Sequence, residues 1–90
     1  MLVLPAELTQ EQAAACCRML AAALRSDSQT AVVADAGALQ RFDSSALAVL
    51  LECRREALGS GKTFSVARMP PRLRELAVVY GVAELLPAAP

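Results

Sequence analysis

Two adjacent serines, Ser44 and Ser45, follow Asp43 at the predicted start of a long helix. The first N–H groups of a helix have no acceptor within the helix, and the helix dipole adds about half a positive charge there. A carboxylate or phosphate is therefore favoured at this position, and a phosphoserine would gain both the free donors and the dipole. Helix capping is the alternative interpretation, because Asp and Ser are preferred caps. Asp35, which ends the preceding strand, is likewise either a turn residue or part of a binding surface.

The side chains that activate a serine nucleophile are missing from this chain. It contains no histidine, and its single lysine, Lys62, falls in a turn with no evident geometry toward Ser44 or Ser45. No glycine-rich phosphate loop is present either. The sequence therefore predicts a protein that is not an enzyme.

The three cysteines form neither a disulfide framework nor a zinc motif. Cys16 and Cys17 are adjacent in a helical pattern, where their side chains diverge, and Cys53 leaves an odd number. No pair of them has metal-ligand spacing. We therefore expect the three cysteines to act as small buried apolar residues. The protein would lie in a reducing compartment and would hold no metal and no cofactor.

The net charge and the hydrophobic content of the chain limit the kinds of partner that it is expected to bind. Nine Lys and Arg balance nine Asp and Glu, which argues against a nucleic-acid binder that relies on phosphate neutralisation. A near-neutral chain in which 56% of the residues are hydrophobic tends to associate, so a partner subunit or a homodimer is expected. No segment approaches the ~20 apolar residues of a membrane span, and the first residues lack the features of a signal peptide.

The pattern of apolar residues predicts alternating strands and helices in one domain, residues 1–90. Pro5 has no N–H to donate, so the first strand lies at an edge. Thr9 and Gln12 have the spacing of a capping box. The continuous apolar run at 30–34 predicts a central strand buried on both faces. Strands are expected at 2–4, 30–34 and 63–67, and helices after Thr9, over 46–58 and after Pro70.

Two features of the packing also follow from the sequence. Only three residues are aromatic, so the core must be built from Ala, Leu and Val, which favours close packing of helices on the sheet. In the third helix, Leu73, Leu76, Ala77 and Tyr80 form an apolar stripe. Residues 82–86 are expected to pack as a short turn, followed by a disordered tail at 88–90.

Two segments resemble the STAS domain family: FDSSALAVLL at 42–51 and LRELAVVYGV at 73–82. That family includes bacterial anti-sigma-factor antagonists and the MlaB subunits of Mla phospholipid transporters. The resemblance covers nearly the whole chain, and the ending LAVVYGVAELLP at 76–87 is most similar to the MlaB branch. It implies a small α/β fold with a largely parallel or mixed sheet of about four strands and helices packed on it in β-α-β-α-β-α order.

The resemblance implies two alternative functions. In the MlaB branch, the hydroxyl after the aspartate lies in the surface that contacts the ATPase of an ABC transporter, and that position is Ser44. Asp43, Ser45, Leu47 and Asp35 would belong to the same partner-binding surface. The protein would then be cytoplasmic and peripheral to the inner membrane through the transporter complex, without inserting into the bilayer.

In the antagonist branch, a serine kinase phosphorylates the hydroxyl two residues after the aspartate, and that position is Ser45. Because both positions are serine, Ser44 and Ser45 are both candidate phosphoacceptors, and the motif does not choose between the branches. The partner would then be an anti-sigma factor or its kinase.

The chain departs from the family pattern in two places. The family usually has glycine where this chain has Ala46, which stiffens the helix start and removes a point of close backbone approach. The family commonly begins with a two-stranded hairpin, whereas only eight residues precede the first helix here. We therefore expect the first strand to be missing or shortened.

Overall fold

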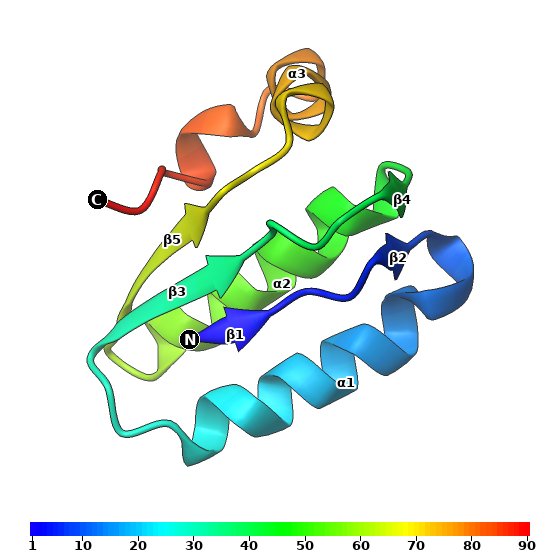
Figure 1. The fold of residues 1–90 in the computed structure, drawn as a ribbon. Coiled ribbons are helices and arrows are strands. Elements are labelled where there is room, and N and C mark those ends of the chain that lie inside the picture. Colours follow the sequence, from blue (N-terminus) through cyan, green and yellow to red (C-terminus); the bar gives the residue numbers. More distant parts are fainter.

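The computed structural model describes residues 1–90 and shows an α/β fold (Figure 1). The predicted alternation of strands and helices is confirmed, but five strands form two sheets where about four strands were expected. None of the helices is long and apolar enough to cross a membrane. The elements are β1 (Leu2–Val3), β2 (Glu7–Leu8), α1 (Gln10–Ser26), β3 (Ala31–Asp35), β4 (Arg41–Phe42), α2 (Ser45–Gly59), β5 (Thr63–Ala67), α3 (Pro71–Val79) and the 3-10 helix η1 (Ala83–Leu85).

The larger sheet has the parallel strand order β1-β3-β5, so β3 is central and β1 lies at an edge, as predicted. Val32 and Ala34 of β3 point into the core, and α2 crosses behind β3 and β5 (Figure 1). The expectation that this strand is buried on both faces was wrong. Ala31 is exposed and Val33 only half-buried, because no helix covers the other face of the sheet.

The second sheet, in which β2 pairs with β4 in parallel, was not predicted. It continues the path of β1 and β3, since the N–H of Leu4 donates to the carbonyl of Asp35 (3.0 Å) and the N–H of Gln40 donates to the carbonyl of Ala6 (2.8 Å). Each strand has only two residues, too few to show a period of two in the sequence. The first eight residues thus supply two short parallel strands, and the expectation of a shortened first strand holds.

The first helix begins as its capping box predicts. The Thr9 N–H and hydroxyl both donate to Gln12 Oε1, at 2.9 and 2.7 Å. The buried face consists of Cys16, Leu20 and Leu24. This face packs against α2, which in turn packs on β5, so α2 is the helix at the centre of the fold.

Small residues form much of the core, as the scarcity of aromatic residues predicts. Of the three aromatic side chains only Phe64 is buried. Alanines without any exposed surface bring the helices close to the sheet and to one another. They are Ala34, Ala36, Ala46, Ala57 and Ala77.

The end of the chain differs from the prediction. Leu73 and Ala77 of α3 are buried, but Tyr80 is 60% exposed, because the helix ends at Val79 and Gly81 turns the chain at φ +74°. The expected packing of the terminal turn is confirmed by Leu86, which is fully buried. The expectation of a disordered tail at 88–90 was wrong, since Ala88 pairs in parallel with Val66 of β5.

Candidate functional site

Asp43 links the starts of two helices. Its Oδ1 accepts the N–H of Ser45 in α2 (2.8 Å), and its Oδ2 accepts the N–H of Gln10, the first residue of α1 (3.1 Å). The hydrogen bond from Ser45, followed by that from Gln10, holds the pKa of this carboxyl below its usual value. One carboxylate thus caps α1 and α2 together and fixes the corner that presents the two serines.

The two serines differ in exposure. Ser44, the N-cap of α2, is exposed and its side chain makes no capping hydrogen bond, whereas Ser45 is half-buried in the first turn. Ser44 therefore presents its hydroxyl to solvent at the tip of the helix. No group of three or more His, Cys, Asp or Glu side chains is placed to hold a metal ion.

An apolar groove of about 270 Å³ begins at Ser44 and runs between α2 and the end of α3. On α2 its residues follow the spacing i, i+3, i+4 and i+7, which places them on one face of the helix. Leu47 is only 3% exposed and forms part of the core below the groove, whereas Ala48 is exposed. The lining residues are Ser44, Leu47, Ala48, Leu51, Tyr80 and Val82.

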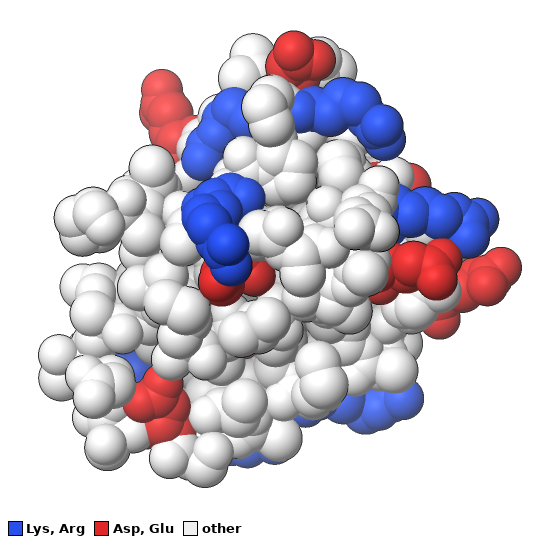
Figure 2. Space-filling view, viewed as in Figure 1, with Lys and Arg blue, Asp and Glu red and all other residues white.

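Sequence reasoning found only the first two of these residues, Ser44 and Leu47. The helical spacing of Ala48 and Leu51 with Ser44 was a usable signal for the α2 side. Tyr80 and Val82 had no such signal, because only the tertiary structure brings the end of α3 beside α2. Figure 2 shows a face that is largely uncharged, with Lys and Arg side chains spread over it at the α3 end, at the β2–β4 end, at its centre and along its lower edge.

Asp35 is buried, with only 8% of the residue exposed, and both of its carboxylate oxygens accept hydrogen bonds from within the chain. Arg68 Nε donates to Oδ1 (3.0 Å), Arg68 Nη2 donates to Oδ2 (2.6 Å), and the N–H of Gly37 donates to Oδ1 (2.9 Å). Arg68 first, and then Gly37, hold the pKa of this carboxyl below its usual value. No hydrogen bond joins Asp35 to Asp43 or to the serines, so the structure does not gather all the predicted site residues at one point.

The part of the chain that matches a known family includes all of these site residues. A family described as "Mlab, STAS domain" matches residues 1–87, from β1 through η1. The chain belongs to the MlaB-like STAS domain family. No curated protein matched the chain. The corner of Asp43, Ser44 and Ser45 and the adjoining groove therefore lie within the matched part of the STAS domain.

We predict that the cysteines of this STAS domain react slowly with thiol reagents in the native state. Burial raises the pKa of the Cys53 thiol to about 12, and burial also raises the pKa of Cys16 and of the half-buried Cys17. Time-resolved alkylation at neutral pH followed by mass spectrometry should detect Cys17 first and Cys53 only on unfolding. Immediate labelling of Cys53 in the folded protein would contradict this prediction.

We also predict that the STAS domain loses stability in acid. The folded-state pKa values of Asp35 and Asp43 lie below the usual 3.8 of the unfolded chain, so their contribution is present above that pH. It declines as the pH falls through 3.8 and toward the lowered values. Thermal unfolding followed by circular dichroism should show a smaller acid loss for Asp43→Asn than for the wild type.

Glu75→Gln is the matched control for this acid prediction, because Glu75 is an exposed carboxylate without a hydrogen bond or ion pair. It should leave the pH dependence unchanged. Equal acid sensitivity of wild type, Asp43→Asn and Glu75→Gln would show that the corner carboxylate has no part in the loss.

Proposed function

We propose that this STAS domain is a non-catalytic subunit that binds the ATPase of a phospholipid-transporting ABC complex and regulates or stabilises it. Membership of the MlaB-like family supports the class of partner. The observation that carries the proposal is the apolar groove that begins at Ser44, the position to which the family's partner-contacting hydroxyl maps. The complex would hold the subunit at the cytoplasmic face of the inner membrane.

Exposed apolar side chains where α3 ends, one of which lines the groove, support a protein partner. Val78, Val79 and Tyr80 at the end of α3 are 63%, 79% and 60% exposed. Consecutive large apolar residues in contact with water are typical of interaction surfaces. An apolar segment of the ATPase would fill the groove and cover these side chains, with Ser44 supplying a polar contact at its rim.

The direct test introduces a charge into the groove. Ala48 is exposed on α2, so Ala48→Glu should leave the fold intact and place a carboxylate where the partner packs. Burying an unpaired charge is strongly unfavourable, and we expect affinity for the ATPase to fall by at least about tenfold. The measurement is co-purification with an ATPase from a lipid-transporting ABC complex of the same organism, followed by titration calorimetry.

Ala22→Glu is the matched control, because Ala22 is also an exposed helical alanine but lies on α1 and outside the groove. It should bind the ATPase as the wild type does. Leu47 is unsuitable for this test, since its side chain is buried and a bulky substitution would disturb the core. Full binding by Ala48→Glu would show that the groove is not the contact surface.

A second candidate function is a switch operated by serine phosphorylation. Two hydroxyls at the start of α2 support it, with Ser45 as the position implied by the antagonist branch and Ser44 as the more exposed one. A phosphate would add about 1.5–2 negative charges and repel an acidic partner surface. Incubation with candidate kinases and ATP should then give a phosphorylated mass that Ser45→Ala or Ser44→Ala removes. No mass shift, together with normal function of Ser45→Ala, would exclude the switch.

A further inference from the structure

Arg68 is the one residue other than glycine with a positive φ, at +54°. This backbone conformation is unfavourable for a residue with a Cβ and persists only where surrounding contacts hold it. Arg68 comes directly after β5 and three residues before the first residue of α3. The unfavourable conformation therefore lies at the point where the chain leaves the sheet and turns toward α3.

The contacts that hold Arg68 come from the neighbouring strand. Asp35 ends β3 and is the register partner of Ala67, the last residue of β5, so Arg68 follows directly after this pair. The two guanidinium–carboxylate hydrogen bonds, at 3.0 and 2.6 Å, fix both the position and the plane of the arginine head group. The N–H of Gly37 orients the carboxylate from the other side at 2.9 Å.

Gly37 is also required for the approach of the arginine. A Cβ built at this position would lie 2.4 Å from Arg68 Cζ and 2.5 Å from Nε, so the guanidinium occupies the space that any other side chain would need. Residues from the end of β3, the following loop and the end of β5 thus form one unit: Asp35, Gly37 and Arg68.

The turn at Arg68 determines where the second wall of the groove stands. The chain that leaves this turn forms α3, and the residues directly after α3 include Tyr80 and Val82, which line the groove. We propose that the Asp35–Arg68 pair is a positioning element that holds α3 against α2 and so keeps the groove in its binding-ready shape. The effect of this pair on partner binding rests on the proposed function, but its effect on the position of α3 does not.

The test compares two substitutions that remove the same ion pair. Glycine adopts a positive φ without strain, so Arg68→Gly can keep the turn. In Arg68→Ala the residue is either strained in this conformation or leaves it, which changes the turn. We expect amide hydrogen exchange in α3 to be roughly tenfold faster in Arg68→Ala than in Arg68→Gly, in line with the cost of a left-handed residue with a Cβ. Exchange in α1 should be the same in both variants, because α1 packs on α2, β1 and β2, at the opposite edge of the sheet from β5.

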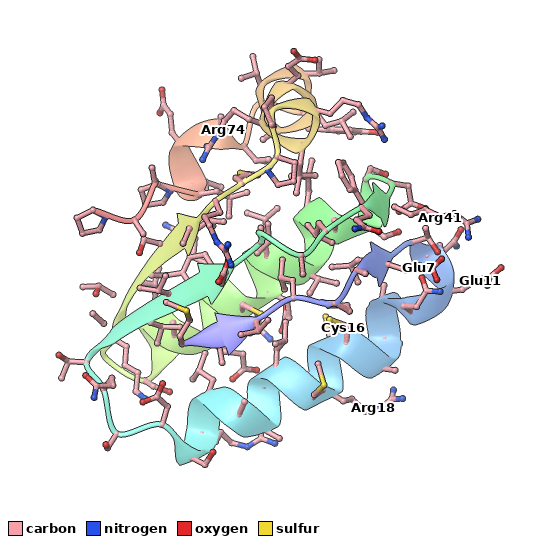
Figure 3. The ribbon with its side chains drawn as sticks, viewed as in Figure 1. Glu7, Glu11, Cys16, Arg18, Arg41 and Arg74 are labelled. Carbon is pink, nitrogen blue, oxygen red and sulfur yellow. The ribbon has the colours of Figure 1, made fainter.

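Two further variants change the other two residues of this unit, Asp35 and Gly37. Asp35→Asn removes the charge, and Gly37→Ala pushes the guanidinium off the carboxylate, so both should also accelerate exchange in α3 relative to the wild type. Glu11→Gln is the control, since Glu11 is an exposed carboxylate at the start of α1 that makes no hydrogen bond or ion pair (Figure 3). It should leave exchange in α3 unchanged.

Tyr80 supplies an independent measure of the groove. It is the only tyrosine of a chain without tryptophan, so fluorescence excited at the tyrosine band reports on this one wall. Acrylamide should quench it more strongly in Arg68→Ala than in Arg68→Gly. Exchange in α3 at the wild-type rate in both Arg68→Ala and Asp35→Asn, or parallel acceleration in α1 and α3, would overturn the positioning role. Full ATPase binding by Ala48→Glu would contradict the proposed function alone, so the two failures are distinguishable.

Discussion

Leu50→Ala is expected to lower the free energy of unfolding by about 2–5 kcal/mol. Leu50 has no exposed surface and lies in α2, the helix that packs against both α1 and β5. Removing three carbons there takes away apolar contacts and leaves a cavity that the helices and the sheet cannot both close. Since domains of this size are stable by only about 5–15 kcal/mol, this one change removes a large share of the total.

Urea denaturation followed by circular dichroism measures this loss. Leu58→Ala is the matched control, because Leu58 lies in the same helix but is 47% exposed. The control should lose much less, since a partly exposed side chain gains less from burial and leaves no closed cavity. Equal losses in the two variants would show that α2 is not packed between α1 and β5 as described.

Ala57→Leu tests the opposite change, an increase in volume, and is expected to destabilise the domain by about 1–3 kcal/mol. Ala57 has no exposed surface, and its carbonyl accepts the N–H of Ser60 (3.1 Å) and of Lys62 (2.9 Å) where the helix ends. A larger side chain would push α2 away from its neighbours and disturb the turn into β5.

The same measurement applies to this variant, with Ala48→Leu as the control. Ala48 lies in the same helix but is exposed, so its substitution should change stability by less than about 0.5 kcal/mol. An Ala57→Leu variant as stable as the wild type would mean that the core has room for a larger residue. The close packing attributed to the buried alanines would then be wrong.

The parts of the fold that sequence predicted are those in which local chemistry and periodicity agree. The capping box of Thr9 and Gln12 located the start of α1, and the alternation at 63–67 gave the bounds of β5 as observed. The two-residue strands β2 and β4 were missed because their pairing depends on partners more than thirty residues away. Tyr80 was included in the apolar stripe of the third helix but is exposed, because such a stripe does not show where a helix stops.

The candidate site likewise has a part that the sequence predicted and a part that only the structure showed. Asp43, Ser44 and Ser45 were recognised from residue type and position, and the structure places them at a helix start, where the sequence predicted them. The additional bond from Asp43 to Gln10 was not foreseen, since it joins residues 33 positions apart. Arg68 was passed over as one arginine among eight, because only its backbone conformation and its contact with Asp35 distinguish it.

By itself the sequence determined the class of fold, the family resemblance and the helix start that carries the serines. These depend on hydrogen bonds and apolar spacing within a few residues of one another, which the order of residues specifies directly. Only the tertiary structure decided that the end of α3 faces α2 across an apolar groove and that Asp35 binds Arg68. Such contacts join distant segments, and their geometry follows from how the whole core packs rather than from any local pattern.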